Sequence, residues 1–226
     1  MISKRDWTAI VIIGMWVGLL AQFILANLWG DIAFALNGRF GFVPPQWAAH
    51  IGIFLGFTLL APLALLVLSL LAKYVAPVIY QIGKFAAVGS SNAAVDIGLL
   101  NLISLFVFID KGWWVFQAVA SATAFLATIN SFLWNKFWTF EAGKSEEKTL
   151  MQVVRFYAVT GLVAILNGYV TGLIASSVLD AGLSDAQATN VGKVAGIFAG
   201  MTFNFLGYKF IVFKKKDASP VPAGTA

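Results

Sequence analysis

The chain has 226 residues, of which 60% are hydrophobic and only 11% are charged, and its formal net charge at pH 7 is +5. This balance excludes an ordinary soluble globular domain, because so few polar side chains cannot cover apolar runs of about 20 residues or more. The absence of cysteine excludes a disulfide framework, a thiolate metal site and a cysteine nucleophile.

Six apolar segments are long enough to cross a bilayer, which requires about 20 residues per helix. The sequence therefore predicts an all-α polytopic membrane bundle with six transmembrane helices, joined by short connections such as an outer loop over residues 30–46. Two spacings of small residues, Gly14-x-x-x-Gly18 and Gly52-x-x-x-Gly56, are expected to be surfaces where helices pack closely. The predicted helices span about residues 7–29, 47–73, 85–108, 113–135, 153–179 and 187–211.

The distribution of basic residues predicts the topology. With both termini in the cytoplasm, the inner side receives twelve of the 15 lysines and arginines, and only Arg39, Lys111 and Lys193 lie elsewhere. This asymmetry is the positive-inside pattern of a multi-pass protein of the cell inner (plasma) membrane. The basic residues lie just outside the helix ends, where anionic lipids of the cytoplasmic leaflet attract them. This attraction accounts for the net positive charge, so a nucleic-acid partner is not expected.

Residues 84–213 contain two versions of one helical hairpin. The first opens KFAAVGSSNAAVD at Lys84 and closes NSFLWNKFWTF at Phe140; the second opens RFYAVTGLVAILN at Arg155 and closes FNFLGYKFIVF at Phe213. A duplicated hairpin in lipid predicts a pseudo-symmetric bundle. The corresponding positions include Phe85 and Phe156, Asp96 and Asn167, Lys136 and Lys209, and Phe140 and Phe213.

Asp96 is the first candidate binding residue. It lies twelve residues beyond Lys84, or about 18 Å into the membrane, and Asn92 and Gly89 fall on the same helical face. A carboxylate at this depth should face the bundle interior or a wet cavity. We expect it to contact substrate, and the alternative is a structural acid hydrogen-bonded to neighbouring helices. Asn167 keeps the equivalent position in the second hairpin without the charge.

Lys193 is the second candidate. It lies sixteen residues before Lys209, about 24 Å from the inner end of the last helix, on a stripe with Asn190, Gly200 and Asn204. The lysine could hold a phosphate beside this polar stripe, or it could extend its ammonium to the outer headgroups. Because its depth is similar to that of Asp96, we hypothesise that the two residues form an ion pair with which a lipid phosphate competes.

The remaining candidates lie toward the inner ends of the helices. Asn130 and Asn204 offer amides for substrate, although hydrogen bonding between helices is the simpler role. A ring of basic residues offers charge-assisted contacts to phosphate, although positive-inside anchoring would also explain it. The predicted ring comprises Lys84, Lys136, Arg155 and Lys209.

These motifs resemble the GtrA-like family of small four-helix membrane proteins. The resemblance rests on FAAVG at Phe85, Asp96, SFLWNKFWTF at Ser131, RFYAVTG at Arg155, and Lys193 with NFLGYKFIVF at Asn204. It implies a four-helix domain over residues 84–213. Residues 1–83 lie outside that pattern as an additional transmembrane hairpin, and residues 214–226, which are rich in small residues and proline, are expected to form a disordered basic cytoplasmic tail. It also implies membrane translocation (flipping) of a polyprenyl-phosphate-linked sugar for synthesis of cell-surface polysaccharide or glycolipid.

Two other functions remain open from the sequence. One is a non-catalytic membrane subunit that anchors or regulates a polyprenyl-phosphate glycosyltransferase, and the other is a small proton-coupled transporter. The single histidine, His50, has no nucleophile or metal-ligand pattern around it, and the chain has no GxxxxGK[ST] loop. We therefore predict no enzymatic activity, cofactor or metal. The expected partners are a polyprenyl-phosphate sugar, membrane lipids, a second copy of the chain in a homo-oligomer and, for the subunit function, a glycosyltransferase.

Overall fold

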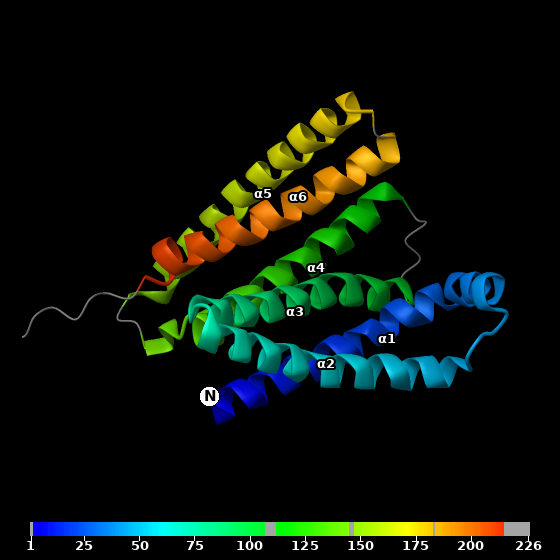
Figure 1. The fold of residues 1–226 in the computed structure, drawn as a ribbon, viewed down its shortest axis with the longest axis horizontal. Coiled ribbons are helices and arrows are strands. Elements are labelled where there is room, and N and C mark those ends of the chain that lie inside the picture. Colours follow the sequence, from blue (N-terminus) through cyan, green and yellow to red (C-terminus); the bar gives the residue numbers. More distant parts are fainter. Residues whose placement is uncertain (1, 107–111, 145–146, 183, 215–226) are drawn as a thin grey trace, which may run out of the picture. The chain divides into compact units, whose positions relative to one another are not determined.

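The computed structural model describes residues 2–106, 112–144, 147–182 and 184–214, and these residues form six α-helices and no strand. All six are long and apolar enough to span a membrane, which confirms the predicted all-α polytopic bundle (Figure 1). The tail predicted to be disordered lies, from residue 215 on, outside the described residues. The helices are α1 (Lys4–Phe40), α2 (Gln46–Tyr74), α3 (Val78–Ser104), α4 (Trp113–Trp134), α5 (Thr149–Asp180) and α6 (Asp185–Gly207).

Helix α1 is much longer than predicted. It begins at a capping box made by Ser3 and Asp6 and continues to Phe40, where Gly41 adopts a left-handed conformation with φ of 65°. The predicted loop over residues 30–46 was therefore wrong over most of its length. Residues 31–40 include the helix formers Ala33, Ala35 and Leu36, and the helix ends only at Gly41, ahead of the prolines at 44–45.

Two π-helical turns follow α4 and α6 at equivalent positions of the repeat, Asn135–Thr139 and Tyr208–Val212. A π-turn is uncommon and is often found at functional sites. Each turn contains the lysine of the repeated K-F-x-x-F ending, Lys136 or Lys209. The ammonium of each lysine lies within 6 Å of two phenylalanine ring centroids, at the same spacing in both repeats. The duplication read from the sequence is thus a duplication of local structure.

The chain divides into two compact units, Met1–Thr139 and Phe140–Ala226. In the first unit, α1 packs against α2 and α3, and α3 packs against α4, so the additional hairpin and the first repeat share one core. That core is aliphatic and includes Ile10, Ile13, Val17, Leu20, Val88 and Val95. The boundary between the two structural units therefore lies after Thr139. The domain boundary at residue 83 stays a prediction.

Small residues on α1 allow close packing in this unit. A Cβ added to Gly14 would lie 2.7 Å from the carbonyl oxygen of Phe57, and one added to Gly18 would lie 3.0 Å from that of Phe54. The predicted packing role of the Gly14 and Gly18 pair is therefore confirmed. No atom of the described residues lies within 4 Å of a Cβ added to Gly52 or Gly56, so the same prediction for that pair was wrong for packing within the described part of the chain.

The second unit is a hairpin in which α5 and α6 run side by side (Figure 1). At its basic end, a group of aromatic rings forms the core. Phe156 is fully buried and stacks on Tyr208 with ring centroids 4.4 Å apart, while Phe140 stacks on Phe213 at 5.3 Å. Three residues of this core, Phe140, Phe156 and Phe213, are positions that define the repeat, so the motif serves to hold the hairpin together.

Candidate functional site

At the basic end of the first unit, Lys84 is part of a buried network. Its Nζ lies 2.5 Å from Oδ1 of Asp6, and the two side chains are only 6% and 9% exposed. The indole Nε1 of Trp138 donates to the same oxygen over 2.9 Å, and the hydroxyl of Ser3 donates to Oδ2. Buried charges need a partner and further hydrogen bonds. Here Asp6 of the additional hairpin is the partner of Lys84, and Trp138 and Ser3 donate the further hydrogen bonds to its carboxylate.

Other side chains reach the carbonyl groups of the π-turn. Arg5 donates to the carbonyl of Phe137, and Gln81 donates to that of Thr139 over 3.3 Å. Sequence reasoning identified neither Asp6 nor Gln81 as part of a site. A signal for Gln81 exists, because the repeat extends three residues further as Q-x-x-[KR]-F, with Gln152 in the second copy. Asp6 has no such signal, since its segment is not repeated.

Farther along α3, polar side chains pair with α4 at two levels. The amide of Asn130 donates to the Ser91 hydroxyl over 3.3 Å, and the hydroxyl of Thr123 donates to Oδ1 of Asp96 over 2.8 Å. Asp96 is half-buried and accepts this hydrogen bond from a neighbouring helix, which is the contact expected for an acid with a structural role. Asn92 is also half-buried, and its Oδ1 has no hydrogen-bond partner among the described residues. A buried acceptor without a partner is a place where a ligand donor could bind.

These pairs lie at successive levels of α3 and are called here the polar track, defined as Lys84, Ser91, Asp96 and Asn101 with their partners. They lie on different sides of the helix, because Lys84 and Asn101 pair with α1 while Ser91 and Asp96 pair with α4. Ser91, Asp96 and Asn101 lie 7, 12 and 17 residues beyond Lys84, or about 10, 18 and 26 Å along the helix. At the far end, Asn27 of α1 donates to the side-chain oxygen of Asn101 over 3.0 Å and to Ser104 over 2.7 Å. The track therefore places hydrogen-bonding groups at intervals of about 8 to 10 Å across the span.

The second unit has a different arrangement at its basic end. Arg155 pairs with Glu147 over 2.7 Å, but these side chains are 40% and 25% exposed. Arg155 also contacts the carbonyl of Ile211 in the π-turn at 3.5 Å. The Tyr208 and Thr160 hydroxyl oxygens lie 2.8 Å apart. This end is thus more accessible to an anionic headgroup than the equivalent end of the first unit.

Midway along the second unit, Asn167 faces the glycines of α6. A Cβ on Gly196 would lie 2.8 Å from the side-chain oxygen of Asn167, and one on Gly200 would lie 2.9 Å from its nitrogen. Gly196 is the counterpart of Thr123 in the repeat. The first hairpin therefore has a hydrogen bond between Asp96 and Thr123, whereas at the equivalent level of the second hairpin Asn167 packs against the backbone of Gly196.

The other predicted residues have varied surroundings. Lys193 and Asn190 are exposed, whereas Asn204 is half-buried with no hydrogen-bond partner for its Oδ1 in the described part of the chain. Lys136 is buried, and Lys209 is partly exposed. Asp96 belongs to the first unit and Lys193 to the second, and their ion pair stays a prediction. Within the described ranges, no group of three or more His, Asp or Glu side chains could hold a metal ion.

Comparison with known proteins identifies the repeated region. The sequence profile described as GtrA/DPMS, transmembrane domain, matches residues 84–213, which is more than half of the chain. The chain belongs to this GtrA/DPMS family. It is also similar to the uncharacterized membrane protein YngA of Bacillus subtilis (strain 168), with 27% identity over 135 residues that cover 60% of this chain and 80% of YngA. No solved structure matches the chain.

The family match begins at Lys84 and ends at Phe213, so the resemblance derived from the repeated motifs is confirmed with the same bounds. Both π-turns and almost all of the polar track lie within the matched segment. Helices α1 and α2 precede it. The GtrA/DPMS domain of this protein therefore packs its first hairpin against two helices that the family profile does not include, and one of these supplies Asp6.

Proposed function

We propose that this protein moves a polyprenyl-phosphate-linked sugar across the membrane for synthesis of a cell-surface polysaccharide or glycolipid. The polar track of the first unit, in a chain that belongs to the GtrA/DPMS family, is the observation that carries this proposal. A sugar crossing hydrocarbon must replace its hydrogen bonds to water, because polar groups left unpaired there are costly. The polar track offers hydrogen-bonding groups at several depths, and these groups can replace the hydrogen bonds that the sugar loses from water.

Asp96 is the central residue of this mechanism. Its carboxylate accepts a hydrogen bond from Thr123 and retains lone pairs for sugar hydroxyl groups. The unpaired Oδ1 of Asn92 lies one helical turn away on the same face. Considered by itself, the more exposed basic end of the second unit, with Arg155 and Lys209, offers charge-assisted contacts to an anionic lipid headgroup. The polyprenyl chain remains in the surrounding lipid.

The direct test measures transbilayer movement of a polyprenyl-phosphate sugar in liposomes that contain only this protein. We expect movement by the native chain, and a loss of about tenfold or more in Asp96→Asn, because an amide cannot replace a charged acceptor. Lys193→Ala is also expected to lose movement, because this lysine is proposed to hold the lipid phosphate within the span. Absence of movement by folded native protein would contradict translocation and favour a subunit that anchors a glycosyltransferase.

The proposed topology places both termini in the cytoplasm of the inner membrane. Because the chain has no cysteine, single cysteines can report accessibility without background. A membrane-impermeant thiol reagent added to intact cells should label Asn37→Cys near the end of α1 and leave Lys148→Cys unlabelled. The opposite labelling would contradict this orientation, and labelling of both after cell lysis is the control.

A further inference from the structure

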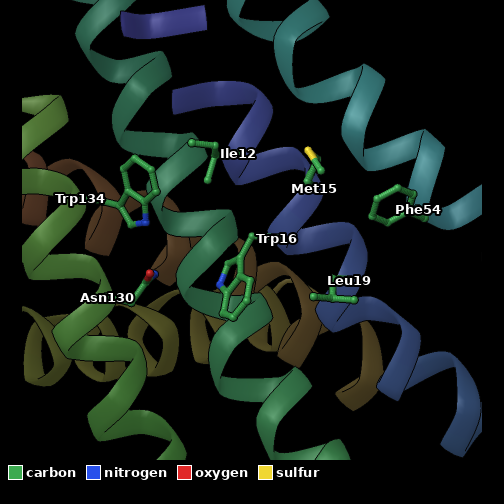
Figure 2. Close-up of a pocket in the computed structure, with 7 residues that line it drawn as sticks. All are labelled: Ile12, Met15, Trp16, Leu19, Phe54, Asn130 and Trp134. Carbon is green, nitrogen blue, oxygen red and sulfur yellow. The ribbon is translucent and has the colours of Figure 1, made fainter. Parts of the chain in front are cut away.

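The first unit contains a groove between α1 and α4 whose residues have no assigned role except Asn130. Its volume is about 530 Å³, within the range of about 300–1,000 Å³ typical of small-molecule sites. Helix α1 contributes four side chains, α2 contributes one and α4 contributes two. Figure 2 shows Trp16 projecting from α1 and Asn130 with Trp134 projecting from α4. The lining comprises Ile12, Met15, Trp16, Leu19, Phe54, Asn130 and Trp134.

The groove lies well inside the membrane span. The hydrogen bond between Asp6 and Trp138 fixes α1 and the end of α4 at one level. Trp16 is ten residues from Asp6, and Asn130 is eight residues from Trp138, which correspond to about 15 and 12 Å along the helices. Half of a hydrocarbon core is about 15 Å. Trp16 is therefore near the middle of the membrane and away from the interface, where tryptophan is usually found.

The groove also presents hydrogen-bonding groups at this depth. Neither the indole N–H of Trp16 nor that of Trp134 donates a hydrogen bond within the described part of the chain, while Asn130 is held in place by Ser91. Trp16 is 41% exposed, so its ring is accessible from the groove. Donors without acceptors are unfavourable in hydrocarbon. An occupant that carries oxygen acceptors to this depth would satisfy them, whereas a plain acyl chain would not.

The lining identifies the chemistry of this occupant. None of its seven side chains carries a charge, so the groove is unsuited to a phosphate group. Two indoles and an amide are suited to a neutral sugar ring, whose C–H faces pack on aromatic rings while its hydroxyl oxygens accept hydrogen bonds. We propose that this groove binds the sugar ring of a polyprenyl-linked sugar, with α1 of the additional hairpin supplying Trp16 as the aromatic platform. This inference rests on the proposed function and adds a role for residues outside the GtrA/DPMS segment.

Photo-crosslinking in proteoliposomes tests the proposal. One probe is polyprenyl-phosphate-linked glucose with a diazirine on the glucose ring, and the second carries the diazirine in the hydrocarbon chain. The ring probe should label peptides that contain Trp16 or Trp134, as mapped by mass spectrometry. Trp16→Leu should reduce this labelling by about three- to tenfold, the effect of losing one hydrogen bond and its ring contact. Trp7→Leu makes the same change on α1 outside the groove and should leave labelling unchanged.

The inference is overturned if the ring probe labels these peptides no more than the chain probe does, or if Trp16→Leu labels like the native protein. Transport measured in the same vesicles separates this result from the proposed function. Movement of the sugar lipid without labelling in the groove would contradict binding of the sugar in the groove and would still support translocation. Labelling in the groove without movement of the sugar lipid would support the binding site and contradict translocation.

Discussion

In the first unit, Lys84 is buried against Asp6 of α1, whereas in the second unit Arg155, at the equivalent position of the repeat, remains 40% exposed beside Glu147. The π-turns are alike in both units. In the first turn, the carbonyl of Phe137 accepts a hydrogen bond from Arg5 of the additional hairpin. In the second turn, the carbonyl of Ile211 contacts Arg155 of its own hairpin. The duplicated scaffold is therefore retained, while the environment of its cation differs.

The same contrast holds at mid-membrane. Asp96 accepts a hydrogen bond from Thr123 in the first unit, and Asn167 lies against Gly196 in the second. The first unit thus concentrates charge and hydrogen bonding inside the membrane, and the second achieves close helix packing with an accessible basic end.

The largest expected effect comes from breaking the buried ion pair. Lys84→Met leaves the Asp6 carboxylate buried without its cation and should lower the free energy of unfolding by about 3–5 kcal/mol. Arg155→Met breaks the exposed pair and should lower it by less than about 1 kcal/mol. Denaturant titration of the purified proteins in detergent, followed by tryptophan fluorescence, gives both values. Equal losses in the two variants would contradict the contrast, and Asp6→Asn combined with Lys84→Met should recover part of the stability.

A smaller effect is expected from the hydroxyl contacts. Thr123→Val removes a hydrogen bond to a carboxylate and should cost about 1.5–3 kcal/mol, while Thr160→Val removes one to the neutral Tyr208 hydroxyl and should cost about 0.5–1.5 kcal/mol. Valine keeps the volume of threonine in both variants, so each serves as the control of the other. If the order of the two losses in unfolding free energy is reversed, the Asp96 contact does not stabilise the first unit.

The third comparison concerns the close approach in the second unit. A Cβ in Gly196→Ala would lie 2.8 Å from Oδ1 of Asn167 and 3.0 Å from its backbone oxygen. The side chain can turn aside but the backbone cannot, so α5 and α6 must separate slightly, at a cost of about 1–3 kcal/mol in unfolding free energy. Gly168→Ala places a Cβ in open space on α5 and should be neutral or stabilise by up to about 1 kcal/mol. The same denaturant titration measures both, and a neutral Gly196→Ala would show that the helix contact is loose.

Much of the architecture could be predicted from the order of residues along the chain. Runs of apolar residues determine the six spans, because a helix in lipid must satisfy its own backbone. The paired motifs determine which positions of the two hairpins correspond, and the π-turns confirm that Lys136 and Lys209 are equivalent. The end of α1 was predicted wrongly, because scattered glycine and charged residues such as Asp31, Gly38 and Arg39 are typical of a loop, although the apolar residues between them still favour a helix.

The amino-acid sequence by itself determined the membrane class, the helical repeat and the GtrA/DPMS relationship, since each depends on local hydrophobicity or on motifs along the chain. Only the tertiary structure decided that Asp6 is the counter-ion of Lys84, that Thr123 holds Asp96, and that Trp16 and Asn130 line one groove. These contacts join residues separated by 27 to more than 100 positions. Helical periodicity shows which residues share a face, but the packing of one helix against another determines which faces meet.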